Sequence, residues 1–412
     1  MSRRTLVAGL AALGLALAIV AIAGVGTGTG TAAPHARQLS GTVALSGWQS
    51  SPVEDNLLRQ VVKAFEKKYP KIKVNYTALG GDYDATMLAK FAARKPPDVF
   101  YVNGHVFPVW VPQGVLAPLT PYIKKSHLST KPFFPRLLNG FKYKGQLYGF
   151  PKDWGPLAMF VNTDMLKKAG AKVPTTWATL RSAAQKLKSS NAVPGGTPIC
   201  LSDDWARLFA FVYQNGYKGG IMRSSSITSR AVAGAATFYT GLWKSGLAKR
   251  PQDVGASWNG DGFMKEKCAI AFEGTWLIPS LKELPNIHYK IASLPKGKTR
   301  GNLAFTVSYS MAKDSQHKAL AWTLLTYLTG RAGMAKWTSL GLSLPSRSDV
   351  KPHKGFSVFI KAAPYSHVWQ GGAKFNDVIT AANNELSAVA EGKQSVSDML
   401  SKIKTAAKNA GQ

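Results

Sequence analysis

The chain has 412 residues, 45% of them hydrophobic, and its 52 basic and 21 acidic side chains give a formal net charge of +31. Since domains usually hold about 100 to 200 residues, this length predicts two domains, each with its own core. Basic chains often bind nucleic acid, but here the lysines are scattered, and neither a zinc-finger spacing nor an RNA-stacking motif is present. We therefore expect no nucleic-acid partner.

The charge imbalance is a shortage of acidic residues more than an excess of basic clusters. In an acidic exterior, carboxylates would be protonated and could supply neither surface charge nor ion pairs. We therefore hypothesise adaptation to such an exterior, which predicts a protein that stays folded near pH 3.

The N-terminus has the pattern of an export signal. Arg3 and Arg4 precede an apolar run over residues 6–25, which is followed by the small-residue segment GTGTGTAAPHA. The run is also long enough to cross a bilayer. Residues 1–37 are therefore predicted to be either a cleaved signal peptide or a retained membrane anchor, and both place the protein outside the cytoplasm.

Cys200 and Cys268 are the only cysteines of the chain. An even pair in an exported protein permits one disulfide, because the compartment is oxidising, whereas the alternative is two buried free thiols. We expect the disulfide. The absence of any cysteine before Cys200 excludes lipid attachment at an N-terminal cysteine.

The first part of the chain alternates strands and helices. Period-two alternation predicts strands at 41–50, 71–79 and 96–104, and helical periodicity predicts helices at 51–70 and 82–95. Such a run implies a parallel sheet, and in open α/β sheets ligands bind beyond the carboxyl ends of the strands. Polar and aromatic residues stand at the carboxyl ends of all three strands, among them Trp48, Gln49, Asp82, Tyr83 and Asn103.

A second α/β unit follows residue 153. The same patterns predict strands at 268–276 and 303–312, separated by the basic, glycine-bearing connector KGKTRGN, and they predict helices at 175–190, 229–246 and 315–330. The last part, 376–410, is predicted to be helical with a new start near Ser395.

Nine motifs occur in a fixed order over residues 41 to 350, and a helical remainder continues to 410. They are VVKAFEKKYPKIKV, PPDVFYV, GVLAPLTPYI, GQLYGFPKD, VNTDMLKKAG, VPTTWATL, FEGTW, ALAWTLLTYLTG and GLSLPSR. In this order the chain resembles family 1 of the extracellular solute-binding proteins of ABC transporters, which includes maltose- and other oligosaccharide-binding proteins.

The resemblance implies an α/β, two-lobed periplasmic-binding-protein type II fold, whose lobes are joined by hinge crossings and close on a sugar. It places residues 41–153 and 303–342 in lobe one, and 154–302 and 343–412 in lobe two. Residues 151–155 would then form a hinge crossing, with Asp153 and Trp154 facing the cleft. Two departures from the family are the missing lipidated cysteine and the scarcity of carboxylates for a sugar clamp.

Sugar recognition needs aromatic platforms for C–H faces and planar polar side chains for hydroxyls. Aromatic residues at predicted strand ends or loops are candidate platforms: Trp48, Tyr83, Trp154, Trp205, Trp258, Trp276 and Trp369. The other tryptophans considered fall in helical patterns and are assigned to the core: Trp177, Trp243, Trp322 and Trp337. For any candidate, ordinary packing is the alternative.

The polar candidates are Gln49, Asp82, Asn103, Asp153, Asp204, Asn259 and Glu273. Their alternative role is to cap a helix or a turn. Asp98, by contrast, is expected to be structural at a strand start. The histidines and cysteines show no metal-ligand spacing, so neither a metal nor a cofactor is expected.

The sequence thus predicts a non-enzymatic, monomeric receptor that captures an oligosaccharide and delivers it to an ABC permease. One alternative keeps the fold but binds an anion such as a glycerol phosphodiester, which the positive charge favours. The other is a secreted glycosidase, which would need two opposed carboxylates.

Overall fold

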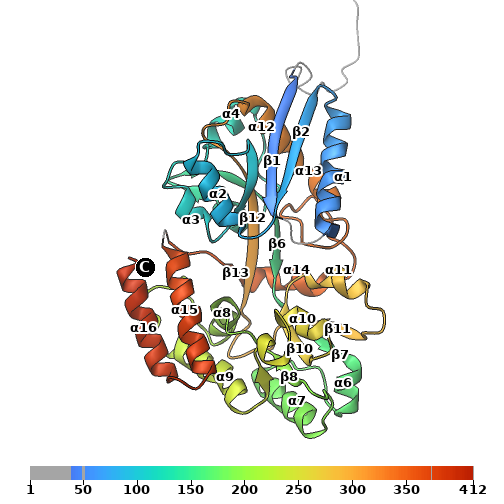
Figure 1. Ribbon diagram of the computed structural model, residues 1–412, viewed down its shortest axis with the longest axis vertical. Helices are drawn as coiled ribbons and strands as arrows, with labels where there is room; N and C mark the ends of the chain where they lie inside the picture. Colours follow the sequence, from blue (N-terminus) through green and yellow to red (C-terminus); the bar gives the residue numbers. More distant parts are fainter. Residues whose placement is uncertain (1–38, 49–51, 373, 412) are drawn as a thin grey trace, which may run out of the picture. The chain divides into compact units, whose positions relative to one another are not determined.

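The structure is a computed structural model that describes residues 39–48, 52–372 and 374–411. The predicted leader, Gln49 and the start of the helix predicted at 51–70 lie outside these ranges. The described chain is a mixed α/β structure with two main sheets (Figure 1). Within the same ranges, the structure contains no helix long and apolar enough to span a membrane.

The larger sheet has six strands. They are β1 (Gly41–Trp48), β2 (Ile72–Leu79), β3 (Val99–Asn103), β6 (Gly149–Pro156), β12 (Asn302–Met311) and β13 (Ser366–Val368). The order is β13-β12-β3-β1-β2, with β6 paired to β12. Since β1 runs parallel to both β2 and β3, the parallel arrangement predicted for the first three strands is confirmed. Strand β12 runs antiparallel to β3 and β6.

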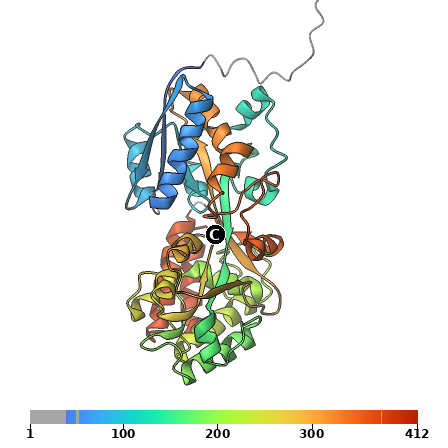
Figure 2. The same cartoon turned by 90° about the vertical axis from the view of Figure 1, so that its right-hand side faces the viewer.

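Several helices and a short hairpin accompany this sheet. They are α1 (Pro52–Lys68), α2 (Tyr83–Ala92), α3 (Phe107–Trp110), α4 (Thr120–Ser126), α5 (Pro135–Asn139), α12 (Lys318–Leu328), α13 (Arg331–Trp337), β4 (Lys142–Tyr143) and β5 (Gln146–Leu147). Helix α1 packs on β2 and contacts α12 and α13, as Figures 1 and 2 show. The apolar face predicted for α1 is buried at Leu57, Leu58, Val61, Val62 and Phe65, which explains why this segment folds as a surface helix.

The smaller sheet has five strands in the order β11-β7-β10-β8-β9. They are β7 (Ala158–Asn162), β8 (Thr197–Cys200), β9 (Ala248–Lys249), β10 (Cys268–Glu273) and β11 (Tyr289–Ala292). Cys200 and Cys268 form the expected disulfide, with a Cα–Cα distance of 5.5 Å. It ties β8 to β10 and stabilises this part of the fold by roughly 2 to 4 kcal/mol through the unfolded state.

The remaining helices are α6 (Thr163–Lys168), α7 (Trp177–Ser189), α8 (Trp205–Gln214), α9 (Arg230–Lys244), η2 (Pro251–Val254), α10 (Asn259–Met264), α11 (Leu277–Lys282), α14 (Ser357–Ala362), η3 (Ala363–Tyr365), α15 (Phe375–Ala390) and α16 (Val396–Asn409). Helices α15 and α16 pack on each other and on α9. The predicted new helix start near Ser395 is confirmed, because the Ser395 side chain caps α16.

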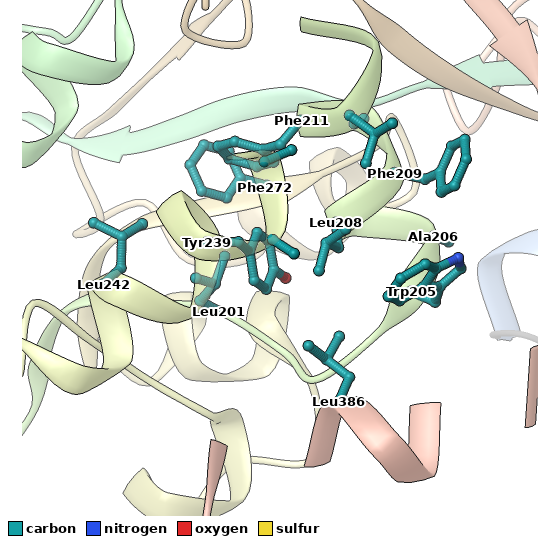
Figure 3. Close-up of a cluster of buried hydrophobic side chains, with 14 of the residues drawn as sticks. Leu201, Trp205, Ala206, Leu208, Phe209, Phe211, Tyr239, Leu242, Phe272 and Leu386 are labelled. Carbon is teal, nitrogen blue, oxygen red and sulfur yellow. The ribbon is translucent and has the colours of Figure 1, made fainter. Parts of the chain in front are cut away.

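Helix α8 lies in the core beside the smaller sheet. Figure 3 shows Trp205 and Leu208 of α8 near Leu386 of α15, and Phe211 beside Phe272 of β10. The rings of Phe211 and Phe272 meet edge-on, with centroids 5.4 Å apart. This packing buries α8 almost completely and fixes its N-terminal end, where Trp205 and the capping residue Asp204, two of the predicted site residues, lie.

The chain passes from one sheet to the other at the end of β6. Every residue of β6 is buried, and β7 of the smaller sheet begins only two residues after β6 ends. Residues 338–345 run beside this passage, because the backbone of Leu344 exchanges hydrogen bonds of 3.1 and 2.9 Å with Trp154. Asp153 and Trp154 therefore lie where the elements of the two sheets are joined.

Candidate functional site

A cavity of about 560 Å³ lies beside this passage and is lined by elements associated with both sheets. Its aromatic lining consists of Trp48, Trp154, Trp258, Trp276, Phe305 and Trp337. The charged and polar side chains of the lining include Glu54, Asn103, Lys152, Asp153, Thr275, Ser280, Glu283 and Ser343. Such a combination of rings with a few polar groups is typical of sites for small organic ligands.

The aromatic rings of the wall are held by other rings and by hydrogen bonds. Trp48, at the end of β1, meets Tyr83 and Tyr101 edge-on at centroid distances of 5.4 and 4.9 Å. Trp276 meets Phe305 of β12 in the same way at 5.7 Å. Since edge-to-face pairs are favourable, these contacts restrict the rings.

Trp154 is fixed at both its backbone and its indole. Its Nε1–H donates to the carbonyl oxygen of Pro345 at 3.1 Å, in addition to the backbone bonds with Leu344. A second, largely apolar cavity of about 320 Å³ also includes Trp154 in its lining, together with Phe134 and Leu137. Trp154 therefore belongs to the walls of two cavities.

A buried cation lies in the wall on the side of the larger sheet. The Lys152 side chain is 3% exposed, and its Nζ lies 2.6 Å from Asp153 Oδ2 and 3.9 Å from Glu54 Oε1. The same ammonium lies 3.8 Å from the ring centroid of Trp337 and 4.7 Å from that of Tyr101. Two carboxylates and two ring faces thus offset the desolvation of this charge.

Asp153 connects this cation to the cavity wall. Its Oδ2 accepts hydrogen bonds from Trp337 Nε1 at 2.7 Å and from Ser343 Oγ at 3.1 Å, besides the contact with Lys152. Ser343 belongs to the segment that runs beside β6. The carboxylate therefore links β6, α13 and this segment at one point.

Glu273, at the end of β10, is fully buried and lies behind the wall rather than in the described lining. Both of its oxygens accept from Arg207 Nη2 at 2.8 Å, and Oε2 also accepts from Trp276 Nε1 at 2.8 Å. Burial raises the pKa of Glu273, although the Arg207 charge opposes this shift. The carboxylate is thus linked to the cavity wall through the Trp276 indole.

Four of the predicted aromatic residues lie in the wall of the cavity, namely Trp48, Trp154, Trp258 and Trp276. The other three are placed elsewhere. Tyr83 is buried, with its hydroxyl donating to the carbonyl of Tyr101 at 3.0 Å. Trp205 belongs to the core around α8, and Trp369 packs against Phe375 with ring centroids 5.1 Å apart.

Of the predicted polar residues that the structure describes, Asn103 and Asp153 lie in the lining of the cavity, and the others lie outside it. Asp82 caps α2 by accepting from Ala85 N at 3.0 Å, and Asp204 caps α8 by accepting from Ala206 N at 2.8 Å. Asn259 is 1% exposed, and its amide donates to Ser202 Oγ at 3.1 Å. Capping and core packing, the alternative roles, thus account for the positions of these side chains.

Asp98 has the structural role that the sequence predicted. Its buried carboxylate accepts from Ala44 N at 2.8 Å and from Ser315 Oγ at 2.6 Å, so it joins β1 to the segment after β12.

Several residues of the lining were not among the predicted site residues, including Glu54, Lys152, Phe305 and Trp337. Trp337 was assigned to the core because it lies in a helical pattern. It is indeed 3% exposed, yet its indole N–H reaches Asp153 and its ring is part of the wall. Lys152 could have been noticed as a lysine inside an otherwise apolar strand, between Pro151 and Asp153.

Comparison with known proteins agrees with this architecture. The profile of the bacterial extracellular solute-binding protein family matches residues 49–335. The chain is 26% identical over 373 residues to the arabinooligosaccharide-binding protein of Bacillus subtilis, covering 85% of this chain and 83% of that protein. The chain therefore belongs to the bacterial extracellular solute-binding proteins.

Two solved structures share the fold. One is an ABC substrate-binding protein of Listeria monocytogenes in complex with cycloalternan, with a TM-score of 0.82, 23% identity, and coverage of 90% of this chain and 99% of that one. The other is the GacH receptor of Streptomyces glaucescens, with a TM-score of 0.79, 22% identity, and coverage of 90% and 98%. The protein thus has the two-lobed α/β fold of periplasmic sugar-binding proteins, as expected.

Proposed function

We propose that this protein is the extracytoplasmic substrate-binding component of an ABC transporter and that its cavity takes a neutral oligosaccharide. The observation that carries the proposal is the lining of the cavity. Tryptophans associated with both sheets, such as Trp48 and Trp276, accompany hydrogen-bonding side chains in a space of about 560 Å³. Rings that stack on sugar faces, together with polar groups for hydroxyls, suit this ligand class.

The charges of the lining favour a neutral ligand over an anion. The described part of the lining has three carboxylates, Glu54, Asp153 and Glu283, and one cation, Lys152. Lys152 already lies 2.6 Å from Asp153, so little of its charge remains for a phosphate. Although the whole chain is strongly basic, an anion in this cavity would be repelled.

Capture would follow from closure of the two lobes on the sugar. We assign residues 41–153 and 303–342 to lobe one and residues 154–302 and 343–412 to lobe two, with the passage at Asp153 and Trp154 as part of the hinge. A ligand that contacts both walls favours the closed form, because it makes more contacts in that form than in the open one. The loaded monomer would then deliver the sugar to the permease, outside the cytoplasm, where the predicted leader directs it.

The cavity gives less support to a glycosidase. Hydrolysis needs one carboxyl group that can donate a proton and a second carboxylate across the bond. The Asp153 carboxylate is already engaged, because Lys152, Trp337 and Ser343 all contact its Oδ2. Incubation with labelled arabino- and malto-oligosaccharides should therefore leave them intact, and their turnover would remove the receptor proposal.

A thermal-shift screen tests the proposal directly. We expect at least one neutral trisaccharide, among arabinotriose, maltotriose and mannotriose, to raise the melting temperature, because a ligand of the folded state stabilises it. Glycerol 3-phosphate should leave it unchanged. A rise with glycerol 3-phosphate that disappears at high salt, with none from the sugars, would contradict a neutral ligand.

The variant Trp258→Ala tests in the same screen whether the sugar stacks on the cavity wall. Trp258 is half-buried and lies in the wall, so its loss should weaken the sugar-induced shift while the unliganded protein still melts as a folded molecule. The control is Trp243→Phe, because Trp243 lies on α9 and packs against Tyr239 with ring centroids 5.2 Å apart, away from the described cavity lining. An unchanged shift in Trp258→Ala would count against stacking on this wall.

A further inference from the structure

Two tryptophans of the cavity wall donate their indole N–H groups in the same way. Trp276 donates its indole N–H to Glu273 at 2.8 Å, and Trp337 donates its own to Asp153 at 2.7 Å. Each carboxylate is in turn paired with a cation, Arg207 for Glu273 and Lys152 for Asp153. The wall on each side thus contains a ring tied to a buried ion pair.

The cation behind Trp276 is held on several sides. Arg207 Nη2 donates to both oxygens of Glu273 at 2.8 Å, Nη1 donates to Asp204, and Nε donates to the carbonyl of Phe272 at 3.3 Å. A planar guanidinium can meet these acceptors together, whereas a lysine ammonium is a point charge. Neither Arg207 nor Glu273 is among the residues that line the described cavity.

The Trp276 ring also packs against apolar neighbours. It is half-buried, meets Phe305 edge-on, and lies over the backbone of Gly274, where an added Cβ would come within 2.1 Å of the ring. Gly274 therefore leaves the space that the ring occupies. Rotating the ring out of this position would remove a donor from the fully buried Glu273, which is unfavourable in the interior.

We propose that Arg207 is a positioning residue of the binding site, which orients the Trp276 ring through Glu273. The inference rests on the proposed function, since it assigns Trp276 as a sugar platform. A ring that is already ordered does not lose its rotational freedom when the ligand binds. Losing this order should weaken sugar binding by roughly three- to tenfold, given the usual cost of immobilising one side chain.

The first test needs no ligand. In a spectrum of the indole N–H groups of ¹⁵N-tryptophan-labelled protein, the Trp276 resonance is assigned by its loss in Trp276→Phe. In Arg207→Gln it should move upfield and broaden, because the hydrogen bond to a paired carboxylate weakens. Arg207→Lys should give an intermediate result.

The matched control is Arg250→Gln. Arg250 is another paired arginine, 3.3 Å from Asp203 and 3.1 Å from Glu391, but it contacts no tryptophan in the described structure. Its loss should lower stability and leave the Trp276 resonance in place. If Arg207→Gln also leaves that resonance unchanged, the proposal is overturned. If Arg207→Gln does not fold, Glu273→Gln replaces it, since it removes the charge and keeps an acceptor oxygen.

The second test measures coupling. Titrations with arabinotriose and maltotriose should show weaker binding in Arg207→Gln than in the wild-type protein. The same substitution should have little further effect in the Trp276→Phe variant, because phenylalanine has no indole N–H to donate to Glu273. An equal loss in both backgrounds would show that Arg207 acts independently of Trp276 and would overturn the proposal. If neither sugar binds the wild-type protein, the proposed function fails for these probes, while the indole spectrum still decides the role of Arg207.

Discussion

The two sides of the cavity hold a tryptophan in the same way but use different cations. On the side of the larger sheet, Lys152 lies in the wall itself and is covered by the rings of Trp337 and Tyr101. On the other side, Arg207 lies behind the wall and binds Glu273 with its planar fork. The lysine here thus combines one short contact to a carboxylate with ring faces, whereas the arginine relies on several directed hydrogen bonds.

This difference predicts unequal costs when each cation is removed. The largest effect is expected for Arg207→Ala, which leaves the fully buried Glu273 carboxylate without its charge partner. Because an unpaired buried charge is costly, the free energy of unfolding should fall by about 3 to 5 kcal/mol. Urea denaturation monitored by circular dichroism would measure it, and a loss below about 1 kcal/mol would contradict the assignment.

The disulfide is a second difference between the two sides, because it joins two strands of the smaller sheet. Replacing Cys200 and Cys268 by alanine should lower the free energy of unfolding by about 2 to 4 kcal/mol. Hydrogen exchange should increase mainly in β8 and β10, whereas β1 to β3 of the larger sheet should keep their protection. Equal acceleration in both sheets would show that the two sides unfold as one unit.

A smaller loss is expected for Lys152→Met, about 1 to 3 kcal/mol. Asp153 would keep the hydrogen bonds from Trp337 and Ser343, and the thioether chain would fill the space between the rings. The same denaturation series gives the value. If this variant lost more stability than Arg207→Ala, the contrast between the two cations would be wrong.

The smallest effect concerns Asp84, on the side of the larger sheet. Burial, with a contribution from the charge of Asp82, raises the pKa of Asp84 to about 6. The folded state therefore binds this proton more tightly than the unfolded chain, and stability is lost as the pH rises from about 4 to 6. Asp84→Asn should raise the stability by about 1 kcal/mol at pH 7 and by nothing at pH 3.5.

Melting curves of Asp84→Asn at several pH values test whether the gain in stability is confined to neutral pH. His105 is the control, because its titration should affect stability in the opposite pH direction. Its Nε2 lies 3.9 Å from Asp84 Oδ2, and burial lowers its pKa to about 4. Ionising it costs stability as the pH falls from about 6.5 to 4, so His105→Gln should stabilise the protein at acidic pH only. A gain from Asp84→Asn that is independent of pH would contradict a titration effect.

Much of the fold could be predicted because it depends on local patterns. The apolar face from Leu57 to Phe65 predicted α1. The alternation of strands with helices in the first part of the chain predicted a parallel sheet. The disulfide followed from two cysteines in an exported chain. These features depend on residues a few positions apart or on the compartment, so one sequence contains the needed information.

The site was predictable only in part. A loop tryptophan at a strand end can turn to the cavity, as Trp276 does, or into the core, as Trp205 does. Likewise an aspartate before a helix can bind a ligand or cap that helix, as Asp204 does. These choices depend on what packs against the side chain from distant segments.

By itself, the sequence determined the alternation of strands and helices, the apolar faces, the cysteine pair and the chemical types available for a site. Only the tertiary structure decided that Lys152 and Asp153 meet Trp337, 184 residues further along the chain than Asp153, and that Glu273 lies behind the wall rather than in it. The physical reason is that burial and charge pairing are set by neighbours in space. Because these neighbours come from distant segments, their effect does not appear as a periodic pattern in the sequence.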